Sequence, residues 1–192
     1  MAARGSYAKG VAKREEILTT ALDVIARNGY RRTSVRELAE AVGLSQAGLL
    51  HYFSSKEELF HEILRKRDER DAASFDLPGA ERIDAFLALI RHNAEVPGLV
   101  QLYAQLSTEA SEPEHPSHSY FVERYATIRH SFAELVRHEQ AAGAVDASLD
   151  PEQISALLLA AADGLQTQWM LDPSIDMAAG IEYLWRLVTQ RV

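Results

Sequence analysis

Small and polar side chains that suit DNA base reading lie together within the stretch Thr33–Lys56, at the predicted start of a short helix. They are Ser45, Gln46, Ala47 and Gly48. A helix start of this kind fits the major groove, where a Gln amide can bond adenine and an Ala methyl can touch a thymine methyl. Small residues also let the backbone come close. The order of residue types therefore predicts contacts with base edges.

Side chains that suit phosphate or guanine flank this short helix. Arg36 lies at the start of the preceding predicted helix and can reach a guanine or a phosphate. Tyr52 and Lys56 follow one and two turns later, and their hydroxyl and ammonium donors suit phosphate oxygens. His51 fits a phosphate contact and a solvent-facing position equally well, so both interpretations stay open.

Local signals predict how these residues are held. Ser34 and Glu37 have the spacing of a capping box, Gly43 supplies a turn, and Ser45 caps the next helix. The short helix is expected to run from Gln46 to about Tyr52. Ser54 or Ser55 is expected to cap a long helix over about 55–71.

The chain that precedes this stretch predicts one helix and one arm. Apolar residues recur at helical spacing from Lys13 to Asn28, and Gly29 is expected to end that helix. Residues 1–12 are polar and basic and are interpreted as a mobile arm. Such an arm can lie along phosphates, or it can touch nothing.

The rest of the chain also reads as helices, because no sustained alternation of strand type occurs in the sequence. Proline and glycine breaks separate helices expected at about 80–95, 98–111, 117–142, 151–171 and 175–190. We therefore predict an all-α fold of about nine helices. Residues 1–56 would form a helix-turn-helix DNA-binding domain with a basic N-terminal arm, and residues 57–192 a helical sensing and dimerisation domain.

Charge and composition narrow the classes of function. The net charge is −8, yet residues 1–56 hold nine Lys and Arg against five Asp and Glu. A basic head on an acidic body suits phosphate binding at one end, although chance clustering stays open. The absence of Cys excludes disulfides and thiolate metal sites, and no apolar run is long enough to span a membrane. A cytoplasmic location is expected.

An enzyme is not expected. The segment Gly43-Leu44-Ser45-Gln46-Ala47 nearly matches a nucleophile elbow, but it ends in Ala and lies between helices instead of after a strand. No phosphate-binding loop or zinc motif occurs in the sequence. His115 and His118 lie in an acidic, Pro-rich loop and are interpreted as solvated. The sequence predicts no cofactor and no metal.

The last two predicted helices carry apolar residues almost all round, which favours burial on every side. We expect them to pack on their own core and on a second copy of the chain, as an intermolecular four-helix bundle. An ordinary core in a monomer is the alternative. The residues predicted for the dimer interface are Ile154, Leu157, Leu158, Ala161, Leu165, Ile181, Leu184, Trp185 and Val188.

Residues 33–59, TSVRELAEAVGLSQAGLLHYFSSKEEL, resemble the DNA-binding signature of the TetR (tetracycline-repressor-like) family. The resemblance covers roughly residues 13–60 and implies a homodimer that represses transcription from a palindromic double-stranded DNA operator. It matches Arg36, Gln46, Ala47 and Gly48 to base-reading sites, and Tyr52 and Lys56 to phosphate sites. Leu50 departs from the Tyr of many relatives, which removes one expected phosphate contact.

The same resemblance places a small-molecule effector among the middle helices, where it would shift the long helix and release DNA. The pocket residues expected are Phe86, Tyr103, Leu106, Phe121, Tyr125, Gln166 and Trp169, with Gln105, Glu109 and His92 as further polar anchors. Taken alone, each aromatic residue is more often part of an ordinary core than of a ligand-pocket wall. A neutral or cationic, largely apolar ligand is expected, because this body has no basic cluster of the kind that a phosphate or carboxylate ligand needs. The rival hypothesis is a helical protein-interaction module that does not bind DNA.

Overall fold

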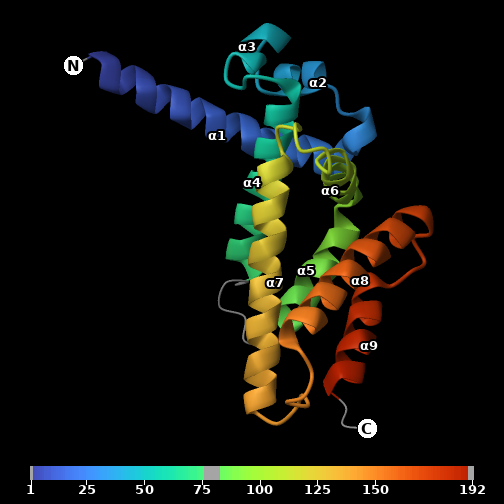
Figure 1. The fold of residues 1–192 in the computed structure, drawn as a ribbon. Helices are drawn as coiled ribbons and strands as arrows, with labels where there is room; N and C mark the ends of the chain where they lie inside the picture. Colours follow the sequence, from blue (N-terminus) through green and yellow to red (C-terminus); the bar gives the residue numbers. More distant parts are fainter. Residues whose placement is uncertain (1, 76–82, 190–192) are drawn as a thin grey trace. The chain divides into compact units, whose positions relative to one another are not determined.

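The computed structural model describes residues 2–75 and 83–189, with side chains from residue 8 onward. These residues form nine α-helices and one 3-10 helix, and no strand occurs among them, so the predicted all-α fold is confirmed (Figure 1). In chain order the helices are α1 Ala2–Asn28, η1 Tyr30–Arg32, α2 Val35–Ala41, α3 Gln46–Leu50, α4 Lys56–Phe75, α5 Ile83–Glu95, α6 Pro97–Glu109, α7 His118–Ala141, α8 Pro151–Leu171 and α9 Met177–Thr189.

Contacts group the chain into two compact units. The first unit comprises Met1–Arg70 and Val96–Ser117, and the second comprises Asp71–Glu95 and His118–Val192. These units are defined by packing contacts. The division after Lys56 into a DNA-binding and a sensing domain is a division by function, and it stays a prediction. In the described part of the chain, no helix is both long enough and apolar enough to cross a membrane.

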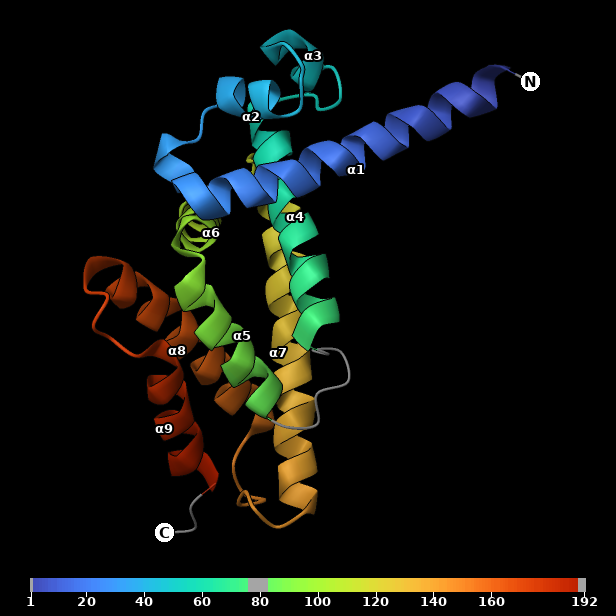
Figure 2. The ribbon, with the colours of Figure 1, turned by 180° about the vertical axis from the view of Figure 1, so that it is seen from behind.

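The first unit is built on α1, which packs against α2 and α6. Figures 1 and 2, which view the molecule from opposite sides, both show α1 passing across the beginning of α4. The core of this unit draws one or more apolar residues from each of these helices, and α3 adds Leu49. Its most completely buried side chains include Ile17, Ile25, Leu38, Leu49, Leu59, Ile63 and Leu102.

Helix α1 is longer than the sequence pattern predicted. Its backbone is helical from Ala2, so residues 2–12 extend the helix that the pattern predicts from Lys13, and the mobile arm over residues 1–12 stays a prediction. The prediction relied on apolar periodicity, which begins only at Ile17. Ala, Arg and Lys favour helix without any apolar face, and such a segment has no periodic signal to find.

Gly98 marks the closest approach between α6 and α1. A Cβ atom at this position would lie 2.2 Å from the Ile25 carbonyl oxygen and 2.8 Å from the Gly29 Cα. Gly29 itself has φ of 80° and ends α1, as the sequence predicted. Two backbones can pack this closely only where no side chain intervenes.

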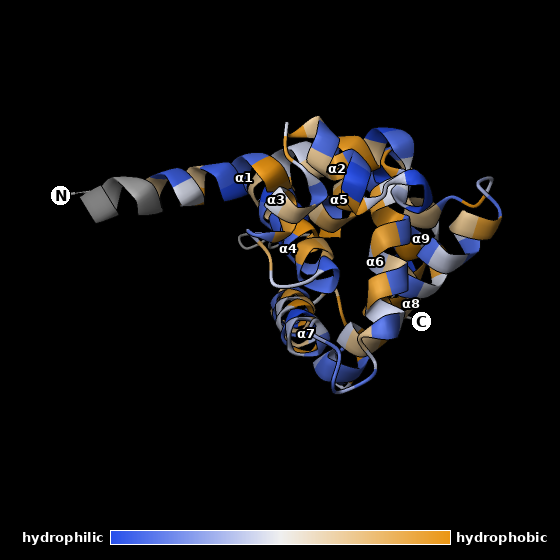
Figure 3. Ribbon diagram, turned by 90° about the horizontal axis from the view of Figure 1, so that it is seen from above, coloured by the Kyte–Doolittle hydropathy of each residue, from blue (hydrophilic) through white to orange (hydrophobic). Residues whose placement is uncertain are grey.

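The second unit packs α7 against α8, α8 against α9, and α5 against α9. The rings of Phe86 and Phe132 meet edge to face with centroids 4.7 Å apart. Ser155 Oγ donates to the Arg129 carbonyl at 2.6 Å, and Tyr125 donates to Asp163 at 2.7 Å, so both ties join α7 to α8. Figure 3 shows hydrophobic and hydrophilic residues following one another around the helices, as amphipathic packing requires.

The outward faces of α8 and α9 differ from the predicted interface. Ile154, Leu158, Ile181 and Trp185 are buried in the core of the second unit instead of facing outward. Ala161, Leu165, Leu184 and Val188 are partly buried against that core. Among the predicted residues only Leu157 is well exposed, and Tyr183 and Leu187 join it as exposed large hydrophobics. Helix α8 is apolar nearly all round, so its sequence gives no signal for which stripe turns inward.

We expect Gly98→Ala to lower the free energy of unfolding by about 3 kcal/mol, because two packed backbones must separate to admit the methyl group. Urea unfolding followed by circular dichroism measures the change. Gly10→Ala is the matched control, since its Cβ meets nothing within 4 Å and Ala favours a helix interior by about 0.5–1 kcal/mol. Equal stability of the two variants would contradict the close approach.

Candidate nucleic-acid interface

Helix α2 begins with the capping box that the sequence predicted. The Ser34 side chain accepts from the Glu37 amide at 3.2 Å, and the Glu37 carboxylate accepts from the Ser34 amide at 2.6 Å. Both groups are otherwise unsatisfied at a helix start. This box sets where α2 begins and therefore where Arg36, in its first turn, projects.

The turn between α2 and α3 is a Schellman motif. Gly43 has φ of 68°, its amide donates to the Glu40 carbonyl at 3.1 Å, and the Leu44 amide donates to the Ala39 carbonyl at 2.9 Å. This left-handed conformation favours glycine over residues with a Cβ. The predicted glycine turn is confirmed, with its hydrogen bonds identified.

Helix α3 starts at the Ser45 cap and is only five residues long. The Ser45 hydroxyl accepts from the Gly48 amide at 3.1 Å. Leu49 and Phe53 are buried, so they anchor the inner face of the helix and the turn that follows it. A Cβ at Gly48 would lie 3.3 Å from the Ser45 hydroxyl, so glycine leaves room for the cap.

The predicted base-reading residues lie on the outer surface of this motif. Arg36, Ser45, Gln46 and Ala47 are exposed, and Gly48 is half-buried. The Arg36 side chain is 79% exposed and its Nε donates to Glu40 at 2.8 Å, so a contact with DNA must compete with this ion pair. Exposure and helix position agree with base reading, which stays a prediction.

The predicted phosphate-binding residues lie where α3 gives way to α4. Lys56 and His51 are exposed and Tyr52 is half-buried. The His51 and Tyr52 rings meet edge to face with centroids 6.0 Å apart. The Lys56 ammonium lies 5.7 Å from the centroid of the Phe60 ring, at the first residue of α4.

Ser55, one of the two residues predicted for the role, caps α4. Its hydroxyl accepts from the Glu58 amide at 3.0 Å, and the Glu58 carboxylate accepts from the Ser54 amide at 2.5 Å. Hydrogen bonding from Ser54 lowers the pKa of Glu58, burial opposes this, and Arg14 adds to the lowering. The carboxylate therefore holds the start of α4 most strongly in its charged form.

Two cations of α1 also reach this motif, which the sequence did not predict. Lys13 Nζ donates to the Val42 carbonyl at 3.0 Å. Arg14 Nη1 donates to the Tyr52 carbonyl at 2.5 Å. The spacings of 29 and 38 residues carry no sequence signal, because a carbonyl acceptor belongs to every residue type.

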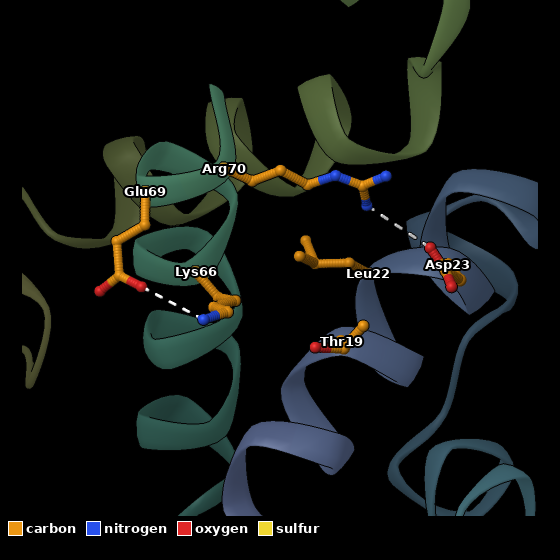
Figure 4. A pocket seen from close by; sticks show the side chains of 6 residues that line it. All are labelled: Thr19, Leu22, Asp23, Lys66, Glu69 and Arg70. Carbon is orange, nitrogen blue, oxygen red and sulfur yellow. Dashed lines mark hydrogen bonds and ion pairs between the residues drawn. The ribbon is translucent and has the colours of Figure 1, made fainter. Parts of the chain in front are cut away.

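A groove between α1 and α4 is a second feature that the sequence did not indicate (Figure 4). Its cations are already paired with acidic groups: Lys66 lies 2.6 Å from Glu15 and 3.4 Å from Glu69, and Arg70 lies 3.6 Å from Asp23. The residues that line it are Thr19, Leu22, Asp23, Lys66, Glu69 and Arg70. The groove thus joins two helices through ion pairs.

The residues predicted for a ligand pocket come from both units. Tyr103 and Leu106 belong to the first unit, and the other five, Phe86, Phe121, Tyr125, Gln166 and Trp169, to the second. Gln166 is 7% exposed, and its Oε1 has no hydrogen-bond donor within the described residues. Gln105 and Glu109 are exposed and bond each other at 2.9 Å, so they do not serve as buried anchors. The pocket as a whole stays a prediction.

Two family profiles match the chain. Residues 17–63 match bacterial regulatory proteins of the tetR family, and residues 117–190 match the C-terminal region of BetI-type transcriptional repressors. The first match contains the whole of α2, α3 and the predicted DNA-binding residues.

Known relatives agree with these profiles. The chain is 42% identical over 55 residues to the HTH-type transcriptional regulator RutR of Escherichia coli K12, which covers 29% of this chain and 26% of that protein. The match thus spans about a quarter of the relative's length. A TetR transcription regulator from Haloarcula marismortui has a similar fold, with a TM-score of 0.75, 20% identity, and coverage of 93% of this chain and 97% of that one.

A transcriptional regulator from Saccharomonospora viridis, crystallised with choline, also has this fold. Its TM-score is 0.70 at 23% identity, with 93% of this chain and 98% of that chain covered. At these identities the structural matches establish the fold alone, and the family rests on the two profiles over residues 17–63 and 117–190.

We expect Glu58→Gln to reduce stability by about 0.5–1 kcal/mol at neutral pH, because the substitution removes the charge that accepts from Ser54 and Arg14. Since folding lowers the pKa of Glu58, its contribution is present above the unfolded-state pKa, about 4.5. The difference from the parent protein should therefore shrink as the pH falls below about 4.5, through the folded-state pKa.

Urea unfolding across a pH series measures this difference. Glu57→Gln is the control, because Glu57 lies in the same first turn of α4 but is exposed. A difference that stays constant with pH would show that the charge of Glu58 is not its cause.

Proposed function

Because the chain belongs to the tetR family of bacterial regulatory proteins, we propose that it is a sequence-specific, DNA-binding transcriptional regulator. It acts as a repressor that a small-molecule ligand releases from a palindromic operator. The observation that carries this proposal is the capped α2–turn–α3 motif, whose inner face is anchored by Leu49 and whose outer face exposes Gln46 and Ala47. The proposed role is that of a regulator acting in the cytoplasm, and not of an enzyme.

Base recognition is assigned to the start of α3 and to Arg36. Gln46 and Ala47 occupy the first turn of a helix that begins at a serine cap, which is the part of a recognition helix that meets base edges. The Gln46 amide offers both a donor and an acceptor, and Ala47 with Gly48 allows the backbone to approach. Arg36 would exchange its bond to Glu40 for a guanine or a phosphate.

Phosphate contacts are assigned to Tyr52 and Lys56. Lys56 is exposed at the first turn of α4, where the helix dipole adds to its positive charge. Leu50 is half-buried and cannot donate a hydrogen bond, so the phosphate contact made by Tyr in many relatives is absent from this assignment. The role of His51 stays open between phosphate and solvent.

A palindromic operator requires two DNA-binding heads related by a twofold axis. We assign the dimer contact to the outward faces of α8 and α9, which expose Leu157, Tyr183 and Leu187 at 63%, 59% and 53%. Large exposed apolar side chains on two helices that pack against each other suit an interaction surface. The partly buried Ala161, Leu165, Leu184 and Val188 would lie beneath or beside this contact.

The effector is assigned to the predicted pocket residues of the second unit. The candidate walls are the aromatic side chains of Phe121, Tyr125 and Trp169. Gln166 supplies a buried hydrogen-bond acceptor. A largely apolar ligand with at least one N–H or O–H donor fits this composition. Binding would stabilise one conformation at the expense of the DNA-binding one.

We expect footprinting of the region upstream of its own gene to reveal a protected inverted repeat. On that operator, Gln46→Ala should cost ~1–3 kcal/mol of discrimination against altered bases, because a bidentate base contact is lost.

Lys56→Ala should weaken binding to all sequences alike and reduce the slope of affinity against salt concentration by about one, because one phosphate contact is lost. Titrations at several salt concentrations measure both effects.

Glu57→Gln is the control for Lys56→Ala, because it changes the charge of the neighbouring exposed residue. Absence of any protected or shifted DNA would overturn the proposed function. Unchanged discrimination in Gln46→Ala would remove that residue from base reading while leaving DNA binding intact.

We expect the protein to be a dimer at micromolar concentration and Leu187→Glu to shift it towards monomer, because a carboxylate would be buried without a partner at the contact. Light scattering measures the mass. Val122→Glu places the same charge at another exposed apolar position, on α7, and is expected to leave the dimer intact. A monomeric parent protein, or equal effects of both substitutions, would contradict the assigned contact.

A further inference from the structure

We propose that Lys13 and Arg14 are positioning residues that hold the two turns on either side of α3, and that they do not bind phosphate. Both lie on α1 in the basic head, where a count of charges treats them as candidates for DNA contact. The inference rests on the proposed DNA-binding function for its consequence, but the contacts themselves lie within the first unit.

Arg14 is committed to the turn between α3 and α4. Its Nη1 donates to the Tyr52 carbonyl at 2.5 Å, and its guanidinium carbon lies 4.3 Å from the centroid of the Phe53 ring. Its Nη2 lies 3.4 Å from Glu58 and 3.2 Å from Glu62 on α4. One planar cation thus joins α1 to the carbonyl that follows α3, to a buried aromatic anchor and to the first turns of α4.

Lys13 is committed to the opposite turn. Its Nζ donates to the carbonyl of Val42, the residue that ends α2. Carbonyl groups at a helix end lack partners within the helix, and a cation there also meets the negative end of the helix dipole. Glu16 lies 2.8 Å from the same ammonium and holds it on α1.

Together the two contacts bracket α3. Val42 lies just before the Gly43 turn and Tyr52 just after α3, so neighbouring residues of one rigid helix hold both ends of the recognition segment. A helix of five residues cannot hold its own orientation by backbone hydrogen bonds. The direction in which Gln46 and Ala47 project therefore depends on these two ties as well as on the buried Leu49 and Phe53.

The burial of the two side chains supports positioning over phosphate binding. The Lys13 and Arg14 side chains are 25% and 30% exposed, whereas Lys9, Arg31 and Arg32 belong to the exposed class. A phosphate contact by Arg14 would withdraw donors from Tyr52, Glu58 and Glu62 together. The net charge of the basic head thus overstates the number of cations available to DNA.

Amide hydrogen exchange on the DNA-free protein tests the ties directly. Arg14→Met keeps the aliphatic stem over Phe53 and removes the guanidinium, and we expect exchange at residues 51–56 to speed up roughly tenfold. Lys13→Met should do the same for residues 42–45. Lys9→Met removes an exposed charge from the same helix and should leave both segments unchanged.

Titration of the operator found by footprinting tests the consequence. Arg14→Met should weaken binding about tenfold while the slope of affinity against salt stays the same, because no phosphate contact is lost. Lys56→Ala, in the same titration, should reduce that slope by about one. Arg14→Lys should recover part of the affinity, since an ammonium can reach the Tyr52 carbonyl but cannot also span the carboxylates.

These measurements test the positioning role of Lys13 and Arg14 separately from the proposed DNA-binding function. Faster exchange confined to the two turns, with an unchanged salt slope, supports positioning. Normal exchange in both turns, or a slope reduced by about one in Arg14→Met, overturns it and makes Arg14 a phosphate ligand. If Arg14→Met fails to fold, exchange and slope in Arg14→Lys decide instead. An absence of any operator would overturn the proposed function, while the exchange measurements would still judge the ties.

Discussion

The first unit depends on one constraint, which is that a helix of five residues must be held from outside itself. Helix α3 has too few internal hydrogen bonds to be stable alone. Its order comes from the buried Leu49, from the Ser45 cap and from the Gly43 turn before it. The exposed residues of α3 carry none of this stability. Their side chains can therefore contact DNA bases without being needed to hold the helix in place, as a DNA-reading helix requires.

The signals for this motif were readable because they are local. A capping box joins Ser34 to Glu37, and the Ser45 cap joins Gly48, each over three residues. Such pairs repeat with the same residue types in unrelated chains, since they answer the same unsatisfied backbone groups. The sequence therefore predicts the order of the helices, the turn and the caps, because each of these rests on residues close together in the chain.

The remaining features depend on neighbours distant in the chain. The contacts of Lys13 and Arg14 end on backbone carbonyls, which no residue type signals. The inner stripe of α8 is hard to predict for a related reason, because a helix with apolar residues nearly all round offers several possible inner stripes. The packing of α7 and α9 against α8 decides that Ile154 and Leu158 turn inward while Leu157 turns out.

The extent of the first unit follows from the spacing of charges on α4. Glu58, Glu62, Lys66 and Arg70 recur every four residues and therefore share one face of the helix. Each pairs with α1: the first two with Arg14, the third with Glu15 and the last with Asp23. Single exposed ion pairs contribute little, but a ladder of them beside the buried Leu59 and Ile63 joins the two helices along about three turns. The contacts of the first unit thus continue along α4 as far as Arg70, beyond residue 63, where the match to the family profile ends.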